Sequence, residues 1–582
     1  MQQRYERRGE PAGPRPEDDD EGWERQTSGR TRPPWFDRGW GGDGDGRPSL
    51  SYRKLEEDIR VDVAVVGGGI AGITTGYLLS REGRKVAVLD DGNIGSGETG
   101  RTTAHITHAL DDRYYRIEKL HGADKARLAA ESQTAAIDFI ESTVREERIA
   151  CDFERLDGYL FLDPTDRKRS LEAELDSVHR AGIVGAELVE RAPLRSFDTG
   201  PCIRFPDQAQ FHPLKYLSGV AGALVRHGGS IFTATHAQEV RSTGVRTSEG
   251  ARVDAESVVI ATNDPIVDRA GKIYLKQDAF RSYAIAAKVK RGAVHKALYW
   301  DTGNQRSKNV VPPYHYIRVQ EPGEGEEGSD GDLLIVGGED HSTANAVEME
   351  GRFEVLERWT RERFPIGEVV YRWSGQVMEP RDSIALIGRN PGDKKRKNVF
   401  IATGDSGNGI TNGTVAGILL NDLVLGKRND WSSLYDPSRR IRGHPSAPYG
   451  GRPRLHKRDP ESVLRIAGGL RAGEGRVLEV SKKGEPVAIY RDLKGKLRSF
   501  STVCPHLGCT VRWNGVEKSF DCPCHGSRFS NSGVAVNGPA NDGLEPARLP
   551  GASKKEEEED RPPSPGKDRR RIRRRARACR GS

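Results

Sequence analysis

Two short boxes of cysteine and histidine near the C-terminus constrain this 582-residue chain more than any other feature. The first box spans residues 504 to 509 and reads CPHLGC, and the second spans residues 522 to 529 and reads CPCHGSRF. A two-iron, two-sulfur centre with mixed ligands needs two thiolates on one iron and two imidazoles on the other, supplied by facing loops. The residues of the right type in the right order are Cys504, His506, Cys522 and His525.

Structural zinc is the alternative, since paired cysteines and histidines at close spacing also suit a tetrahedral site. A zinc ribbon usually separates its ligands by two or more residues, and it has no use for Gly508, Gly526 and Ser527 around them. We therefore favour the iron–sulfur interpretation.

The boxes resemble those of Rieske proteins, and the resemblance implies further roles. The two cysteine ligands would hold one iron, and the two histidines the other. Cys509 and Cys524 would form the disulfide that clamps the loops in the respiratory-complex branch of the family. Ser527 would donate its hydroxyl to a bridging sulfide, which raises the reduction potential. Phe529 stands where higher-potential members carry a tyrosine, so we expect a lower potential, and residues 538 to 540 resemble the proline loop that covers the cluster.

A dinucleotide-binding pattern opens the folded part of the chain. Residues 61 to 66 form an apolar run typical of a parallel strand buried on both faces. A predicted helix (72 to 81) and a second strand (85 to 89) follow, and Asp90 closes that strand where an acid would bind the adenosine ribose. A glycine-rich turn without a nucleotide would not require this order of elements. The glycines that let the backbone approach a pyrophosphate are Gly67, Gly69 and Gly72.

The loop from residue 95 to 105 favours a flavin over a nicotinamide. Its small and hydroxyl residues resemble the loop that passes beneath the isoalloxazine ring in D-amino-acid-oxidase-like FAD oxidoreductases. His105 would pack near the ring or serve as a covalent attachment point. The loop residues that the resemblance assigns to FAD are Ser96, Gly97, Thr99, Arg101, Thr102, Thr103 and Ala104.

A third glycine-rich turn links a predicted strand (399 to 403) to a predicted helix (414 to 425). In the resembling family this turn lies at the pyrimidine end of the flavin, where helix N–H groups stabilise negative charge. No second dinucleotide fingerprint is present, which counts against a reductase with its own NAD(P)H domain. The expected FAD contacts here are Gly404, Asp405, Gly407, Gly409 and Thr411.

Residues 278 to 320 and 333 to 373 alternate like an antiparallel sheet that would roof the flavin. The substrate should lie beneath it, and Arg318 would clamp a substrate carboxylate. The alternative is that these polar side chains face solvent, and the pattern does not decide between the two. The candidate catalytic residues are Tyr283, His315, Tyr316 and Arg318, with Tyr314 beside them.

The expected fold is an α/β (α+β) flavoprotein, with a Rossmann-type FAD-binding domain and an antiparallel substrate domain, followed by a small all-β Rieske domain. We expect helices at 121 to 147, 168 to 180 and 214 to 227, and Rieske strands at 463 to 467, 476 to 481, 486 to 491 and 496 to 503. The predicted parts are a disordered region (1–50), the flavoprotein (51–430), a linker (431–460), the Rieske domain (461–550) and a disordered tail (551–582). Within the flavoprotein, the FAD-binding parts are about 55–110, 212–264 and 374–430, and the substrate parts about 150–211 and 270–373.

The net charge of +7 comes almost entirely from the tail, since residues 554 to 582 hold 12 Lys or Arg and 6 Asp or Glu. Such a tail could bind nucleic acid or anionic lipid through phosphates, but we favour a solvated extension without a partner. No apolar run is of signal-peptide length or long enough to span a bilayer, so the expected location is the cytoplasm.

Together the motifs resemble bacterial FAD-dependent oxidoreductases with a C-terminal Rieske domain. The expected reaction removes a hydride from a small substrate, alpha to an amine, and passes electrons singly to the cluster and an unidentified acceptor protein. Electrons could instead run inward from a ferredoxin, making a reductase or hydroxylase, and a redox sensor that binds nucleic acid through the tail is a further alternative. A ring-hydroxylating oxygenase is disfavoured because no spaced set of two histidines and a carboxylate is found.

Overall fold

The computed structural model describes residues 27–36, 50–267, 271–307, 312–322, 331–344, 351–441, 457–480 and 486–549. The chain divides into two compact units, one of residues 1–453 with 503–544 and the other of 454–502 with 545–582. The loops that carry the two cysteine–histidine boxes therefore belong to the same unit as the flavoprotein. The remaining strands of the C-terminal domain form the second unit.

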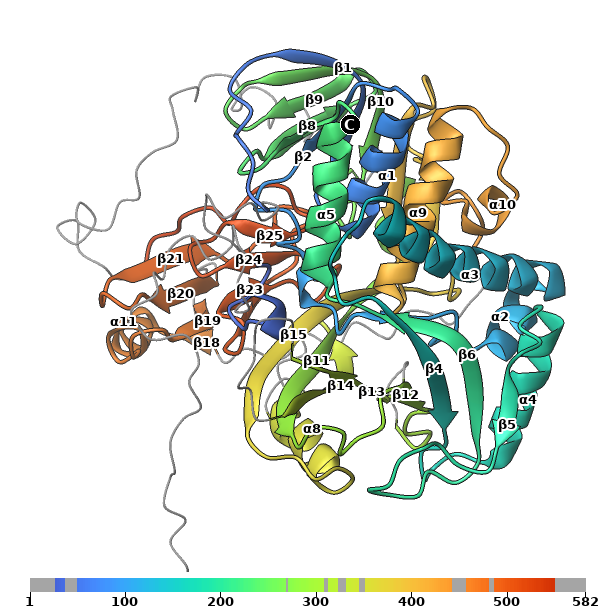
Figure 1. Ribbon diagram of the computed structural model, residues 1–582. Helices are drawn as coiled ribbons and strands as arrows, with labels where there is room; N and C mark the ends of the chain where they lie inside the picture. The colour runs from blue at the N-terminus through green and yellow to red at the C-terminus, as the bar shows by residue number, and fades with distance from the viewer. Residues whose placement is uncertain are drawn as a thin grey trace, which may run out of the picture. The chain divides into compact units, whose positions relative to one another are not determined.

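A mostly parallel sheet forms the centre of the predicted FAD-binding part, with strand order β16-β17-β10-β1-β2-β7. Its core strands are buried because helices α1, α5 and α9 lie side by side over it (Figure 1). The strands are β1 (Ile59–Val66), β2 (Val86–Leu89), β7 (Ser230–Phe232), β10 (Arg252–Ile260), β16 (Leu386–Arg389) and β17 (Val399–Thr403), and the hairpin β8 (Ala237–Arg241) with β9 (Gly244–Thr247) joins β10.

Helices α1 (Ile70–Arg81) and α9 (Gly409–Val424) pack unusually close to each other. A Cβ at Gly413 would lie 2.4 Å from Ile70 Cγ2, and one at Gly417 would lie 2.4 Å from Thr74 Cγ2. Each helix begins directly after the carboxyl end of a parallel strand, so both N-termini point to the same edge of the sheet. Helix α5 (Pro213–Arg226) packs beside α1.

A nine-stranded sheet forms the predicted substrate part, with strand order β15-β11-β14-β13-β12-β4-β6-β3 and β5 paired to β6. Strands β11 to β15 pair antiparallel, as predicted, whereas β12 pairs with β4 in parallel. The strands are β3 (His105–Ile106), β4 (Glu154–Phe161), β5 (Glu187–Val189), β6 (Cys202–Gln210), β11 (Gln277–Val289), β12 (Leu298–Asp301), β13 (His315–Gln320), β14 (Asp332–Ser342) and β15 (Val369–Pro380). The helices of this part are α2 (Tyr114–His121), α3 (Ala123–Glu146), α4 (Lys168–Arg180) and α8 (Arg352–Arg361).

The helix expected from 121 to 147 is confirmed as α3 (Ala123–Glu146), and Gly122, with φ of 88°, separates it from α2. One strand prediction needs correction. The strand expected at 463 to 467 is wrong, because these residues lie in helix α11 (Pro460–Gly468). Asp459 caps that helix by accepting from the Ser462 N–H, and Val463 and Ala467 fall on its buried face.

Two segments expected to be disordered or extended are packed instead. Residues 27–36 carry the short helix η2 (Pro34–Phe36), and Trp35 is 1% exposed in the main hydrophobic core. Residues 431–441 include α10 (Ser432–Tyr435), whose Tyr435 hydroxyl lies 2.7 Å from Ser132 Oγ. The rest of the predicted N-terminal region, residues 442–456 of the predicted linker and the basic tail lie outside the described residues.

The cluster-binding strands form a small sheet of their own in the first unit: β22 (Arg512–Asn514), β23 (Ser519–Asp521), β24 (Arg528–Ser530) and β25 (Ala535–Asn537). The second unit has helix α11 and the sheet β18 (Lys457–Arg458), β19 (Gly475–Val480), β20 (Val487–Arg491) and β21 (Leu497–Ser501). Its core is apolar, with Val463, Ala467 and Ile489 fully buried. Of the helices in the described residues, none has the length and apolarity to cross a membrane.

Candidate redox site

The predicted FAD fingerprint forms a tight backbone turn against β2 and β10. Gly67 has φ 108°, and a Cβ there would lie 2.4 Å from the Ala261 carbonyl oxygen, so only glycine fits. Asp90 accepts the Gly68 N–H at 2.6 Å, and burial raises the pKa of its carboxyl to about 7. Helix α1 then begins at this turn, and its N-cap Gly69 provides no side-chain cap, which suits a pyrophosphate.

The loop expected beneath the flavin is held by side chains from distant segments. Trp35 Nε1 donates to the Thr102 carbonyl at 2.7 Å, and Trp373 Nε1 donates to the Arg101 carbonyl at 2.8 Å. Thr99 Oγ1 accepts the Ile70 N–H at 3.0 Å, which ties the loop to the first turn of α1. These bonds fix the loop beside the fingerprint, as a flavin floor requires.

Arg101 has a different partner from the predicted cofactor. All three of its guanidinium nitrogens donate to protein oxygens, including Glu517 Oε1 at 2.8 Å in the cluster-binding part. His105 also has protein partners at both ring nitrogens, Thr103 Oγ1 at 3.1 Å and the Ile317 carbonyl at 3.2 Å. This arrangement favours packing of His105 near the ring over a covalent attachment.

The third glycine-rich turn lies at the start of α9, with Gly404 and Gly407 both at positive φ. Asp405 Oδ1 accepts the Met378 N–H at 3.1 Å, which joins the turn to the roof strand β15. The turn, the fingerprint and the loop of residues 95–105 thus line one edge of the parallel sheet. Their glycines and helix N-termini fit a dinucleotide such as FAD. The individual FAD contacts stay a prediction, and the Arg101 side chain is taken up by protein oxygens instead.

The two cysteine–histidine boxes fold into matching loops. In the first, Gly508 N–H donates to the Cys504 carbonyl at 3.0 Å, and in the second, Gly526 N–H donates to the Cys522 carbonyl at 3.1 Å. Gly508 and Gly526 have φ of 81° and 84°, a conformation that other residues adopt only with strain. The shared loop conformation explains why each box has a glycine shortly after its histidine, two residues after His506 and one residue after His525.

The four predicted ligands converge between these loops. The Cys504 and Cys522 side chains are hydrogen-bonded to each other and each is 1% exposed. The His506 and His525 rings lie 4.9 Å apart between centroids, and burial lowers the pKa of His525 to about 4. Two cysteine thiols and two imidazoles in one place match the donor set of a mixed-ligand [2Fe–2S] cluster.

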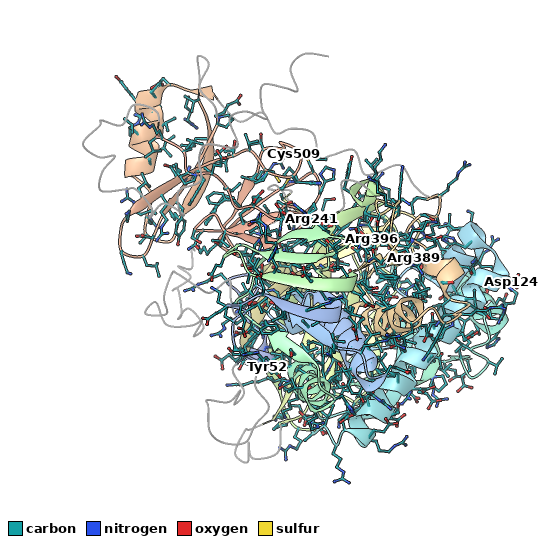
Figure 2. The ribbon with its side chains drawn as sticks, turned by 90° about the horizontal axis from the view of Figure 1, so that it is seen from above. Tyr52, Asp124, Arg241, Arg389, Arg396 and Cys509 are labelled. Atoms are coloured by element: carbon teal, nitrogen blue, oxygen red, sulfur yellow. A yellow bond between two sulfur atoms is a disulfide. The ribbon has the colours of Figure 1, made fainter. Side chains whose placement is uncertain are left out.

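Cys509 and Cys524 form the predicted disulfide, and Figure 2 shows Cys509 in the C-terminal part of the ribbon. The sulfurs of Cys509, Cys524 and Cys522 lie within 4.8 Å of one another, but two of them are bonded together and do not make a metal site. The Ser527 side chain hydrogen-bonds Cys504 and accepts the Ala540 N–H at 3.0 Å. Ser527 therefore links the ligand loops to the proline loop.

The cluster loops contact the flavoprotein directly. Gln376 of β15 donates from Nε2 to the Gly526 carbonyl at 3.0 Å, one residue from the predicted ligand His525. The Gln376 N–H donates to Glu98 Oε2 at 2.8 Å, and Glu98 belongs to the loop beneath the predicted flavin. Glu98 Oε1 in turn accepts from Asn537 Nδ2 at 2.9 Å in β25.

A buried group of charges surrounds Glu517, which lies between β22 and β23. Burial alone would raise its pKa, but Arg101, Arg281 and Arg528 outweigh burial and lower the pKa of Glu517 to about 2. Arg281 is 1% exposed and lies 3.5 Å from Glu517, and its guanidinium nitrogens form no hydrogen bond to any described residue. Thr31 of the N-terminal segment also donates its N–H to Glu517 at 3.0 Å.

The candidate catalytic residues separate onto two faces of the roof. Tyr316 and Arg318 face the loop of residues 95–105, and Arg318 donates to the Ala104 carbonyl at 3.0 Å. His315 lies on the opposite face, where Asp301 and Glu339 outweigh burial and raise its pKa to about 9. Tyr283 lies with the second hydrophobic cluster. None of the four points freely into solvent.

Arg318 is fully buried, and its guanidinium also donates to the Phe211 carbonyl at 3.1 Å and to the Gln320 side chain. The guanidinium carbon of Arg318 also lies 5.5 Å from the centroid of the Trp35 ring, in a cation–π contact. These contacts favour a role in holding the flavin loop, and the carboxylate clamp stays a prediction.

Three polar residues that the sequence patterns did not single out lie near Tyr316. Ser282 Oγ is 2.7 Å from the Tyr316 hydroxyl and also hydrogen-bonds Asp340. Asp340 is 5% exposed, and within the described part of the chain its Oδ1 has no hydrogen-bond partner. Asp111 accepts from the Tyr314 hydroxyl at 2.7 Å and lies against Gly407. The adjacent acids Asp111 and Asp112, in the loop between β3 and α2, are the sequence signal that could have indicated this acidic group.

The family comparisons agree with this geometry. Residues 62–423 match the family of FAD dependent oxidoreductases (DAO), and residues 467–548 match the Rieske [2Fe-2S] domain. The chain is 30% identical over 511 residues to YhfW of Bacillus subtilis (strain 168), which is named a Rieske 2Fe-2S iron-sulfur protein, covering 84% of this chain and 94% of that protein. It is 24% identical over 385 residues to the gamma-glutamylputrescine oxidoreductase of Escherichia coli (strain K12), covering 64% of this chain and 86% of the relative.

Among solved structures, glycine oxidase from Geobacillus kaustophilus has the same fold with a TM-score of 0.52, at 20% identity, over 66% of this chain and 100% of its own. The protein is thus an FAD-binding oxidoreductase with a Rieske [2Fe–2S] domain. The chain belongs to the DAO family of FAD-dependent oxidoreductases.

Proposed function

We propose that this protein is an amine or amino-acid dehydrogenase in which electrons pass between FAD and the Rieske cluster of the same molecule. Bound FAD would supply two-electron oxidation of a substrate C–H bond, and the cluster would supply one-electron exchange with a carrier. Oxidation of an amine to an imine removes one hydride, which carries both electrons, and one proton. Two single-electron transfers per turnover are therefore needed, and an external one-electron carrier protein must collect them.

The contact of Gln376 with both redox parts carries this proposal. Its side chain binds the Gly526 carbonyl beside the ligand His525, while its backbone binds Glu98 of the flavin loop. The ligand loops thus lie one residue away from the segment that would hold the flavin. A cluster that served a distant partner alone would not require this bridge.

The polar groups near Tyr316 support an amine substrate. Asp340 and Asp111 are carboxyl groups whose pKa is raised by burial, to about 7 and about 6. An ammonium group beside them would restore their charged forms and would satisfy the Oδ1 atom of Asp340. The gamma-glutamylputrescine oxidoreductase relative is named for an amine substrate, which agrees with this proposal.

The experiment is anaerobic mixing of the purified holoprotein with a panel of amines and amino acids, followed by the flavin and cluster absorbance. We expect at least one amine to bleach the flavin and then the cluster, with slow turnover on dioxygen. Flavin bleaching that leaves the cluster oxidised would contradict the electron route. Flavin that is bleached by none of the amines and amino acids would contradict the proposed substrate class.

A further inference from the structure

Tyr274 of the flavoprotein lies against both iron-ligating histidines. Its ring centroid is 5.5 Å from that of His506 and 5.0 Å from that of His525, with interplanar angles of 81° and 80°. Edge-to-face pairs between about 4.5 and 7 Å are the favoured aromatic geometry. One side chain of the flavoprotein therefore contacts both imidazoles.

The segment that carries Tyr274 is firmly anchored. It lies in the short helix η4 (Ile273–Leu275), where Ile273 is fully buried in the core of the parallel sheet. The next residue, Lys276, donates from Nζ to the Arg439 carbonyl at 2.9 Å, and its own carbonyl accepts the Arg381 N–H at 3.0 Å. The ring is thus presented to the histidines by a fixed element and not by a loose loop.

The cluster loops close around the same place. A Cβ at Gly526 would lie 2.5 Å from Ala279 Cβ on β11, the strand that follows η4. A Cβ at Gly538 of the proline loop would lie 2.7 Å from the Asp264 carbonyl oxygen. His506 itself is only 4% exposed. The cluster loops thus pack closely against the flavoprotein at these two glycines, and the Tyr274 ring lies between the two histidines and the flavoprotein core.

We propose that Tyr274 is the positioning residue through which the flavoprotein couples to the histidine-ligated iron, and that its ring shields this edge of the cluster from external electron carriers. The coupling role of Tyr274 rests on the proposed function, and the shielding role does not. The contact of Tyr274 with the two histidines matters because it leaves no gap between the flavoprotein and the cluster loops. Removal of the ring would leave a gap that water would fill.

The test compares Tyr274→Ala, Tyr274→Phe and the control Leu275→Ala, which removes an apolar side chain that is 46% exposed on the same short helix. The flavin is photoreduced anaerobically with EDTA as electron donor, and the cluster signal is followed. We expect transfer to the cluster to slow by about tenfold in Tyr274→Ala, equivalent to about 1.4 kcal/mol in the barrier. Tyr274→Phe and Leu275→Ala should match the parent protein, because the ring makes the contact.

A second readout uses a small external oxidant and does not require electron transfer from the flavin to the cluster. The cluster is reduced with dithionite, excess reductant is removed, and ferricyanide is added as a small external oxidant. We expect faster reoxidation in Tyr274→Ala only, with the cluster EPR signal showing that the cluster is retained. If Tyr274→Ala loses its cluster, Tyr274→Leu, which keeps apolar bulk without a ring, is measured in its place.

The outcomes separate the two proposals. A parent protein whose cluster stays oxidised while its flavin is reduced would refute the proposed function, yet the ferricyanide readout would still test the shield. Tyr274→Ala rates equal to the parent in either readout would overturn the role of Tyr274, and so would an equal slowing in Tyr274→Phe.

Discussion

Glu517 is the acidic residue whose replacement should destabilise this protein most. Its carboxylate is fully buried between Arg101 and Arg281, and its pKa falls from the ordinary 4.5 to about 2. A shift of this size corresponds to roughly 3 kcal/mol of stabilisation by the charged form. Breaking a buried ion pair by removing one partner costs about 3–5 kcal/mol, because the other charge is left uncompensated. Glu517→Gln should therefore lower the free energy of unfolding by about 3–5 kcal/mol at pH 7.

The assay is urea unfolding of the holoprotein followed by tryptophan fluorescence, since Trp373 bonds to the same loop as Arg101. Glu249→Gln is the matched control, because Glu249 is 60% exposed in its pair with Lys54 and should cost less than about 1 kcal/mol. Adding Arg281→Met to Glu517→Gln should recover part of the loss, since it removes one of the arginine charges that Glu517 compensates. A Glu517→Gln variant as stable as the control would refute this account of the buried charges.

The pH dependence has a definite sign. A carboxyl with a lowered folded-state pKa stabilises the fold fully above its unfolded pKa, and the stabilisation is lost as the pH falls through the folded value. The stability difference between the parent protein and Glu517→Gln should therefore be constant above pH 4.5 and shrink as the pH falls toward 2. A difference that grew on acidification would contradict the assignment.

Three further predictions concern other parts of the molecule. Gly417→Val should push α9 away from Thr74 of α1 and lower the free energy of unfolding by about 1–3 kcal/mol. It should also lower the amount of flavin bound per protein, and an unchanged flavin content would argue against a flavin site formed by the N-termini of α1 and α9. Ser527→Ala removes a hydrogen bond to Cys504 and should lower the midpoint potential of the cluster in an EPR-monitored titration, whereas a rise would contradict that role. Trp35→Ala should cost about 3–5 kcal/mol and open residues 27–36 to proteolysis, and resistance to protease would show that the segment is held without it.

The redox motifs were predictable because their chemistry is local in the chain. The cysteine–histidine boxes and the strand–glycine–helix pattern each lie within about 30 residues, so spacing alone indicates their geometry. Gly508 and Gly526 follow the same logic, since each closes its own loop.

The faces of the roof were not predictable, because they depend on register. His315 and Tyr316 are neighbours and must point to opposite faces of a strand, and the irregular pairing between Arg281 and Tyr283 shifts β11 against β14. The bond between Arg101 and Glu517 joins residues 416 positions apart, and no local pattern indicates such a pair. Hydrogen bonds and the buried Trp35 hold residues 27–36 in place. The segment has no hydrophobic periodicity, so its sequence predicts disorder.

The most direct test of the central claim is the rate at which the cluster is reduced after flavin reduction, measured by rapid freezing and EPR over a range of protein concentrations. An amine that bleaches the flavin is mixed anaerobically with the holoprotein, and the signal of the reduced cluster is followed. Transfer within one molecule predicts a rate that does not change with protein concentration. A rate proportional to concentration, or a cluster that stays oxidised beside a fully reduced flavin, would contradict the account.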